Sequence, residues 1–154
     1  STPKPSSAAS DVYKRQLPWY RDPEVLRFSE GCDEPYTREM VEKMYNSLSK
    51  NCELYIIELK INKDYLPIGD AALCKNSLPI VIGRKEFRSK GIGKKVLHML
   101  INRAKELGWN KLRVKSVYTY NERARRLYEE AGFKLVNTTS DKEGNQEWQF
   151  ELNL

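Results

Sequence analysis

One amphipathic segment near the middle of the chain most constrains its fold. After Gly91-Ile92-Gly93, apolar residues recur every three or four positions on one stripe of a helix, and Gly108 follows the last turn. The stripe consists of Val96, Leu97, Leu100, Ile101, Ala104 and Leu107. A stripe this wide needs an apolar partner, and the extended segments 53–60, 66–73 and 78–83 that precede it can supply one. The sequence therefore predicts a helix packed on a sheet that begins as an antiparallel meander.

The flanking segments complete the predicted architecture. Asp22-Pro23 and Thr37 are start signals for two early helices, and a further helix is expected from Asn121 to Ala131. Strands are expected over residues 112–117, over residues 133–136 and around Trp148. This order favours an α/β (α+β) fold, with a mixed, mostly antiparallel central sheet flanked by helices.

The length of 154 residues fits one domain. Residues 1–16 are rich in Ser, Pro and Ala and show no apolar periodicity. We therefore expect a leader that is disordered or artificially added, followed by a single domain over residues 17–154. No apolar run approaches the roughly 18 residues of a membrane-spanning helix, so no membrane partner is expected.

Charge, cysteine and histidine content narrow the classes of function. The net charge of +6 favours an anionic partner. Cys32, Cys52 and Cys74 lack the paired spacing of a zinc or redox site, which predicts three reduced thiols, a cytoplasmic protein and no metal. His98 is the only histidine and lies away from the apolar stripe, so we expect it to face solvent. A histidine-dependent catalytic triad is therefore disfavoured.

A basic, glycine-containing segment predicts an anion site. Residues 84–95 hold six basic residues and one acid between a strand and the start of a helix, where backbone N–H groups can converge on a phosphate. The alternative is a simple turn with a solvated basic face. A Walker P-loop is excluded because Arg88 and Lys95 stand where Gly and Ser/Thr belong, and a dinucleotide fingerprint is excluded because Val96 replaces its third glycine.

Two motifs resemble signatures of the GNAT superfamily of acyl-CoA-dependent N-acyltransferases. Residues 88–93 (RSKGIG) resemble the loop Arg/Gln-x-x-Gly-x-Gly/Ala, and residues 121–133 (NERARRLYEEAGF) resemble Asn-x-x-Ala-x-x-Leu-Tyr-x-x-x-Gly-Phe. The two motifs stand in the family's order, and the resemblance covers residues 17–154. Residues 19–25 and Tyr36-Thr37 are similar to the opening of the branch that contains aminoglycoside 6′-N-acetyltransferases and ribosomal-protein N-terminal acetyltransferases.

The resemblance implies acetyl-CoA as cofactor and an acetyl transfer by direct attack in a ternary complex. In the family, the strand before the loop pairs with the pantetheine arm, the loop amides hold the pyrophosphate, and the signature asparagine binds pantetheine or caps its helix. Carried over, the cofactor-binding residues are Val81, Ile82, Gly83, Arg88, Ser89, Lys90, Gly91, Ile92, Gly93, Lys94 and Asn121. The family's proton donor to the thiolate corresponds to Tyr128, for which packing beneath the sheet is the alternative.

The acceptor side is less sharply marked. Family members bind acceptors near the first helices and the last hairpin. An acidic, aromatic loop in this region is therefore a candidate site for a cationic primary amine on a small molecule or peptide. The alternative interpretation is an ordinary solvated loop. The candidate contacts are Glu30, Asp33, Glu34 and Tyr36. Some relatives carry a glutamate base where this chain has Ser116, so no base is assigned, although Asp70 and Glu86 are carboxylates to consider.

The start of the chain departs from the family. Relatives usually open with a β-strand and the first half of a helix, where this chain has its leader. We therefore expect the N-terminal strand to be missing and the edge of strand 53–60 to be uncovered, as in a truncated or mis-joined copy.

Two other functions are alternatives to the enzyme: a catalytically inactive protein of the same fold, and a nucleic-acid-binding module with Tyr118 and Tyr120 as stacking platforms. The enzyme prediction includes no nucleic-acid partner and leaves a homodimer open.

Overall fold

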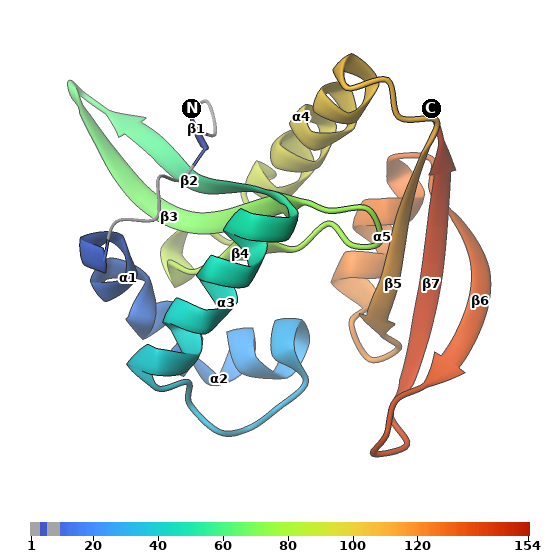
Figure 1. The fold of residues 1–154 in the computed structure, drawn as a ribbon, viewed down its shortest axis with the longest axis horizontal. Coiled ribbons are helices and arrows are strands. Elements are labelled where there is room, and N and C mark those ends of the chain that lie inside the picture. Colours follow the sequence, from blue (N-terminus) through green and yellow to red (C-terminus); the bar gives the residue numbers. More distant parts are fainter. Residues whose placement is uncertain (1–3, 6–9) are drawn as a thin grey trace.

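The structure, a computed structural model, describes residues 4–5 and 10–154 of the chain. Its strands are β1 (Lys4–Pro5), β2 (Glu53–Ile61), β3 (Asp64–Leu73), β4 (Ile80–Ile82), β5 (Lys111–Tyr118), β6 (Lys134–Ser140) and β7 (Gln146–Asn153). Its helices are α1 (Ser10–Gln16), α2 (Pro23–Val25), α3 (Arg38–Asn51), α4 (Ile92–Glu106) and α5 (Glu122–Glu130). Short helical turns are η1 (Leu17–Arg21), η2 (Leu26–Glu30) and η3 (Lys85–Phe87), and Figure 1 shows the arrangement.

The strands form two sheets that separate between β4 and β5. The first sheet has the order β1-β2-β3-β4 and the second β5-β7-β6, and all their pairings are antiparallel. Near their junction the Lys115 N–H donates a hydrogen bond to the Asn76 carbonyl at 3.2 Å. Beyond it β4 and β5 diverge (Figure 1). The predicted fold class, α/β (α+β) with mostly antiparallel strands flanked by helices, is confirmed, but the strands form two antiparallel sheets instead of one mixed central sheet.

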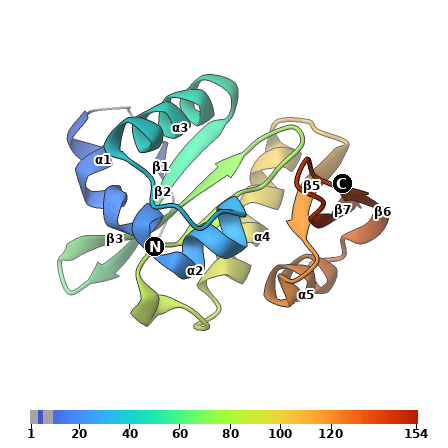
Figure 2. The same ribbon diagram turned by 90° about the horizontal axis from the view of Figure 1, so that it is seen from below.

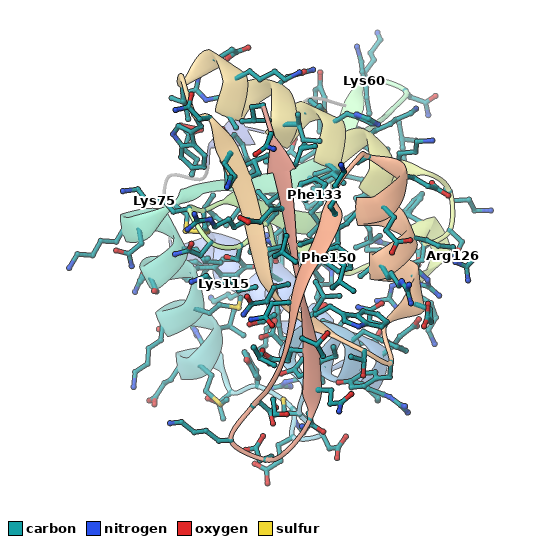
Figure 3. The ribbon with its side chains drawn as sticks, turned by 90° about the vertical axis from the view of Figure 1, so that its right-hand side faces the viewer. Lys60, Lys75, Lys115, Arg126, Phe133 and Phe150 are labelled. Carbon is teal, nitrogen blue, oxygen red and sulfur yellow. A yellow bond between two sulfur atoms is a disulfide. The ribbon has the colours of Figure 1, made fainter. Side chains whose placement is uncertain are left out.

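Helices cover both faces of the first sheet. Along β2, Tyr55 and Ile57 belong to the core that α4 shares with both sheets, whereas Leu54 belongs to the core beneath α1, η1, α2 and α3. This alternation is the period of two that a strand buried on both faces requires. Figure 2 shows α4 next to both sheets, with α1 and α3 on the other side of β2 and β3. In Figure 3, Phe150 of β7 and Phe133, just before β6, lie near the middle of the molecule, while Lys75 and Arg126 lie on opposite sides of it.

The predicted central helix is confirmed over most of its stripe. Its positions Val96, Leu97, Leu100, Ile101 and Ala104 are buried. Leu107 is 41% exposed, because it is the C-cap residue and has already left the buried face. His98 is exposed, as expected.

The N-terminal segment takes part in the fold, which corrects two expectations. Lys4 and Pro5 pair with Ile56 and Tyr55 of β2, so the N-terminal strand is present and the edge of β2 is covered there. Tyr13 is buried and stacks on Tyr45 with ring centroids 5.3 Å apart. The expectation that residues 1–16 stand outside the fold is therefore wrong for the described ones; residues 1–3 and 6–9 lie outside the described residues. A two-residue strand and one buried tyrosine are too short a pattern to produce periodicity.

Two of the three cysteines are paired, so the expectation of three reduced thiols is wrong for them. Cys52 and Cys74 form a disulfide, and Cys32 is free. Glu53 pairs with Leu73 at the end of the β2–β3 ladder. Cys52, just before Glu53, and Cys74, just after Leu73, therefore lie opposite each other. The 22-residue separation hides this relation in the sequence. Within the described part of the chain, no helix has the length and apolarity to cross a membrane.

Candidate active site

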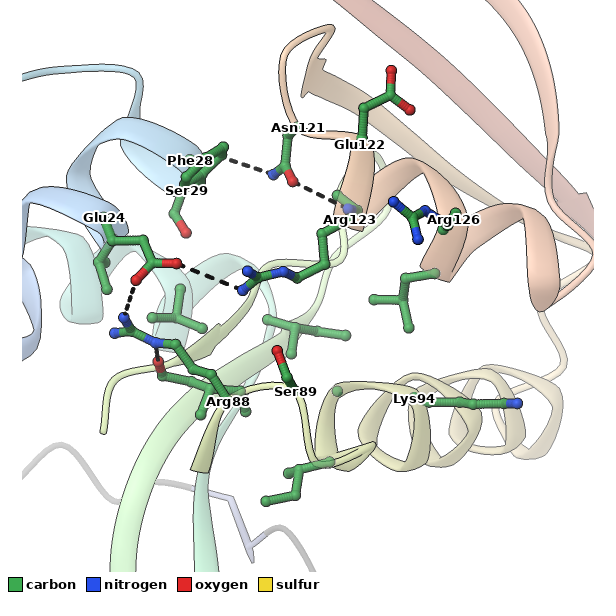
Figure 4. A pocket seen from close by; sticks show the side chains of 18 of the residues that line it. Glu24, Phe28, Ser29, Arg88, Ser89, Lys94, Asn121, Glu122, Arg123 and Arg126 are labelled. Atoms are coloured by element: carbon green, nitrogen blue, oxygen red, sulfur yellow. Dashed lines mark hydrogen bonds and ion pairs between the residues drawn. The ribbon is translucent and has the colours of Figure 1, made fainter. Parts of the chain in front are cut away.

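A cavity of about 730 Å³ lies where the two sheets separate. Its walls are β4, the loop before α4, the start of α5 and the α2–η2 segment. The volume is in the range of small-molecule and cofactor sites. Figure 4 shows the side chains of residues that line it.

The loop before α4 presents backbone N–H groups to this cavity. Gly91 is the N-cap of α4 and has φ +80°, and no side chain caps the N–H groups that follow at Ile92, Gly93 and Lys94. A Cβ atom built on Gly91 or Gly93 would meet nothing within 4 Å, so no other part of the described chain covers the Cα positions of this turn. Ser89 also has a positive φ, +60°, and lines the cavity, whereas Lys90 is exposed and does not. The helix N-terminus is thus free to bind an anion.

The free edge of β4 forms the adjoining wall. Ile80, Val81 and Ile82 line the cavity, and β4 is the last strand of its sheet. The Gly83 N–H donates to the Ile68 carbonyl at 2.7 Å, so Gly83 faces β3 and, by the alternation of an antiparallel ladder, the Ile80 and Ile82 backbone groups face away from it. Gly83 itself does not line the cavity. A Cβ atom there would lie 2.1 Å from the indole of Trp19.

The Arg88 side chain lines the cavity but is already engaged. Its Nε donates to the Ile82 carbonyl at 2.8 Å and one Nη to the Gly83 carbonyl at 3.2 Å. Its Nη groups also bond Glu24 at 2.8 Å and Asp22 at 3.0 Å. These contacts are drawn in part in Figure 4. The guanidinium therefore joins the loop to β4 and to α2.

Asn121 both caps α5 and reaches across the cavity. Its Oδ1 accepts from the Ala124 N–H at 3.1 Å, so the capping role is confirmed, and its Nδ2 donates to the Phe28 carbonyl at 3.4 Å. Arg123 and Arg126 of α5 line the same cavity and are exposed. Together with Lys94 they place positive charge around its opening, against Glu122, Glu130 and Glu24.

Tyr128 lies behind the cavity wall rather than on it. The side chain is 6% exposed and packs on Phe133 and Phe150, with ring centroids 5.4 Å and 5.9 Å away. Its hydroxyl donates to the Leu78 carbonyl at 3.2 Å. Burial raises the pKa of Tyr128 above its usual value, so the phenol is protonated at neutral pH. The Tyr128 side chain therefore packs beneath the sheet.

The acidic loop lies beside the cavity, against the end of β5. The Tyr36 hydroxyl donates to Glu30 at 3.0 Å, and burial raises the pKa of both groups. Asp33 and Glu34 are exposed. None of the four lines the cavity, but Phe28 and Ser29, just before Glu30, do. The structure thus places the predicted acceptor residues next to the cavity, around a single carboxylate–tyrosine contact.

The loop and the last hairpin approach one tyrosine. A Cβ atom on Gly31 would lie 2.2 Å from the Tyr118 hydroxyl, so the loop backbone rests on that ring. Besides burial, negative charge from Glu147, Asp141 and Glu143 raises the pKa of Tyr118. The two acidic segments therefore converge near the end of β5.

The carboxylates considered as a base do not face the cavity. Asp70 is buried and accepts hydrogen bonds from Tyr20 at 2.7 Å and Tyr45 at 2.5 Å. Glu86 is a surface residue that pairs with Arg84 at 2.8 Å. Ser116 is exposed on β5. Among the described residues, no group of three His, Cys, Asp or Glu side chains could hold a metal ion.

The sequence-based reasoning missed several lining residues on the α2–η2 segment and α5. These are Glu24, Phe28, Ser29, Tyr120, Arg123 and Arg126. The acids Asp22 and Glu24 before a run of apolar residues were interpretable only as helix signals. Their contact with Arg88 joins residues 66 and 64 positions apart, which no local pattern indicates.

Comparisons with known proteins agree with this architecture. A family model described as an acetyltransferase (GNAT) domain matches residues 4–134. The fold is similar to that of a domain from Methanocaldococcus jannaschii DSM 2661, with TM-score 0.83 and 22% identity, covering 99% of this chain and 97% of that chain. Spermidine N-acetyltransferase from Vibrio cholerae, solved with CoA and spermine, gives TM-score 0.77 and 17% identity, with coverages of 99% and 94%. Ribosomal-protein-alanine N-acetyltransferase from Brucella melitensis gives 0.76 and 14%, with both chains covered at 100%.

Proposed function

Since the chain belongs to the family of GNAT acetyltransferase domains, we propose that it transfers the acetyl group of acetyl-CoA to a cationic primary amine. The observation that carries the proposal is the cavity between the free edge of β4 and the uncapped N-terminus of α4. An extended, amide-bearing arm with a diphosphate at one end matches these two walls.

The phosphates are proposed to bind at the start of α4. The N–H groups of Ile92, Gly93 and Lys94 point from a helix N-terminus toward open space, and the helix dipole favours negative charge there. Ser89 and Gly91 shape the turn, and Lys90 and Lys94 supply positive charge beside it. Charged donors bind phosphate oxygens more strongly than neutral ones.

The pantetheine arm is proposed to lie along β4. Ile80 and Ile82 direct backbone groups away from β3, and of these the Ile82 carbonyl already accepts from Arg88. An extended arm can therefore add to the sheet along the Ile80 groups and the Ile82 N–H. A backbone N–H on this edge would polarise the thioester carbonyl. One such donor contributes about 2.7–4 kcal/mol to the stability of an oxyanionic transition state. Asn121, at the opposite wall, can contact the arm in addition to capping α5.

The transfer itself follows from these positions. The neutral amine attacks the thioester carbon, the new C–N bond forms, and the C–S bond breaks to release a thiolate. Tyr128 is proposed to protonate that thiolate, since its phenol stays protonated at neutral pH. To do so, its hydroxyl must give up the hydrogen bond to the Leu78 carbonyl. The amine gives its proton to water, because Asp70 and Glu86 do not line the cavity, and water returns a proton to the Tyr128 phenolate, whose raised pKa favours its uptake.

The acceptor is proposed to be cationic because of the charge on its side of the site. Glu30, Asp33 and Glu34 come from one loop, and the acids of the β6–β7 hairpin converge on the same tyrosine. Tyr36 adds an aromatic ring beside Glu30, and a cation binds favourably at such a ring. A structurally similar spermidine N-acetyltransferase was solved with spermine, a polyamine, which supports this class of acceptor.

The test is thermal melting with acetyl-CoA followed by an amine screen. At 100 times its dissociation constant, acetyl-CoA should stabilise the fold by about 2.7 kcal/mol. Free-thiol release is then measured with spermine, kanamycin and a peptide with a free N-terminus. Release that depends on one of these amines supports the proposal. No stabilisation by acetyl-CoA, together with oligonucleotide affinity that falls steeply with salt, would contradict it and favour a nucleic-acid-binding module.

A further inference from the structure

Arg88 differs from the other basic residues of the segment that precedes α4. Its side chain is only 11% exposed, whereas Lys85, Lys90, Lys94 and Lys95 are exposed. A side chain that binds a phosphate is expected to have N–H donors that no acceptor within the protein uses. The Arg88 guanidinium instead donates to four acceptors within the protein: Ile82 O, Gly83 O, Asp22 and Glu24.

The two carboxylates, those of Asp22 and Glu24, come from the start of α2, and each makes a further contact. Asp22 caps that helix by accepting from the Glu24 N–H at 2.9 Å. Burial alone would raise the pKa of Asp22, but the hydrogen bonds from the Glu24 N–H and from Arg88 outweigh it, and the pKa is lowered. Glu24 is also 3.6 Å from Arg123 of α5. Asp22 is therefore ionised, and the two side chains are held by one partly buried cation.

The segment that Arg88 holds is a wall of the cavity. Residues 22–30 run from β4 to the end of β5, where the Tyr120 hydroxyl donates to the Arg27 carbonyl at 2.6 Å and Asn121 donates to the Phe28 carbonyl. The segment ends at Glu30, the carboxylate bonded to Tyr36. The start of the segment, which lies next to β4, is fixed to the cofactor loop because Asp22 and Glu24 accept hydrogen bonds from Arg88. The position of the acceptor wall relative to the loop thus depends on this side chain.

We propose that Arg88 is a positioning residue of the acetyltransferase: its side chain fixes residues 22–30 to the cofactor loop and β4, and does not bind the cofactor phosphates. The inference rests on the proposed function. Without the guanidinium, two neighbouring carboxylates would lose their shared partner, and a partly buried acid without its partner is strongly unfavourable. We therefore expect the segment to detach from the loop, while the backbone amides of the phosphate site remain.

The test compares Arg88→Gln with the double variant Asp22→Asn/Glu24→Gln. Hydrogen exchange of the peptide covering residues 22–30 and calorimetric titration with coenzyme A are measured on each. Both variants should raise exchange in this peptide by about tenfold or more and change coenzyme A affinity by less than about threefold. Combining them should add little, because both remove the same interaction. Arg88→Lys should restore part of the protection, since one ammonium cannot reach all four acceptors.

Arg84→Gln is the matched control, because Arg84 belongs to the same basic segment but pairs with Glu86 at the surface. It should leave exchange in residues 22–30 unchanged. Loss of coenzyme A affinity in Arg88→Gln but not in the carboxylate variant, with unchanged exchange, would overturn the inference and make Arg88 a phosphate ligand. Unchanged exchange in both would overturn it as well. Wild-type protein that does not bind coenzyme A would contradict the proposed function, while the exchange comparison would still test the positioning role.

Discussion

The hydroxyl of Tyr128 donates a hydrogen bond to the carbonyl of Leu78, 3.2 Å away, from a position inside the core that both sheets share. Leu78 lies just before β4, whose free edge forms a wall of the cavity. The tyrosine is therefore hydrogen-bonded to the segment that leads into the strand along which the thioester arm is proposed to lie. This places a protonated phenol directly behind that strand without placing it in the open cavity.

Replacement of this hydroxyl should separate its catalytic from its structural contribution. Tyr128→Phe removes the hydrogen bond to Leu78 and should lower the free energy of unfolding by about 1 kcal/mol. If the phenol protonates the thiolate, kcat should fall by about 10²-fold or more, while coenzyme A affinity stays near the wild-type value. Melting curves, calorimetry and free-thiol release measure the three quantities.

Tyr13→Phe provides the control for this substitution. Tyr13 is also buried and its hydroxyl also donates one hydrogen bond, to Asn46 at 3.0 Å, but on the far face of the first sheet. It should lose a similar amount of stability and keep its kcat. Equal kcat in Tyr128→Phe and wild type would remove this tyrosine from the mechanism.

Most elements were predictable because their signals are local. Thr37 and Asn121 cap α3 and α5 as expected, accepting from N–H groups three residues ahead. The meander before α4 was expected because β-branched and aliphatic runs alternate with turn residues. Local patterns did not predict β1 and α1, because the positions of these elements depend on pairing with β2 and on packing against α3.

The site was predictable only in its backbone part. A glycine at the N-terminus of a helix is visible in a sequence, and Gly91 adopts a positive φ there. The side-chain contacts of Arg88 with Asp22 and Glu24 are set by the tertiary fold, so no local motif indicates them. The Cys52–Cys74 pair was hidden for the same reason.

A charge introduced at Gly91 should abolish cofactor binding. In Gly91→Glu the carboxylate would stand beside the free N–H groups of α4 and repel a phosphate. The substitution also costs about 1–2 kcal/mol of stability, since a non-glycine residue at φ +80° is strained. The melting temperature should therefore fall and no longer respond to acetyl-CoA.

Gly144→Glu is the matched control for the Gly91 variant. Gly144 has φ +84° in the β6–β7 turn, and a Cβ atom there also meets nothing within 4 Å. It should lose similar stability and keep the response to acetyl-CoA. A retained response in Gly91→Glu would show that the phosphates bind elsewhere.

Reduction of the disulfide should destabilise the fold without affecting the cavity. For the 22-residue separation between Cys52 and Cys74, loss of the cross-link should lower the free energy of unfolding by roughly 3 kcal/mol. Melting with and without dithiothreitol measures the effect, and Cys52→Ser/Cys74→Ser should reproduce it. Cys32→Ser should change little, and before reduction only Cys32 should react with an alkylating reagent in the unfolded chain. Alkylation of all three cysteines without reductant would contradict the pairing.

The buried Asp70 carboxyl should make the fold less stable as pH rises from about 4 to 6. Burial is the main cause that raises the pKa of Asp70, to about 6, although hydrogen bonds from Tyr45 and Tyr20 oppose it. The folded chain then holds this proton where the unfolded chain, with a pKa near 3.9, has lost it. Because the folded state binds more protons in this window, its stability is greatest at the acidic end and falls by about 2–3 kcal/mol through the window. Asp70→Asn keeps an acceptor for the two tyrosines and cannot ionise, so urea unfolding from pH 4 to 7 should lose this component of the slope. Parallel pH profiles in the two proteins would show that Asp70 ionises in the folded state at its ordinary pKa.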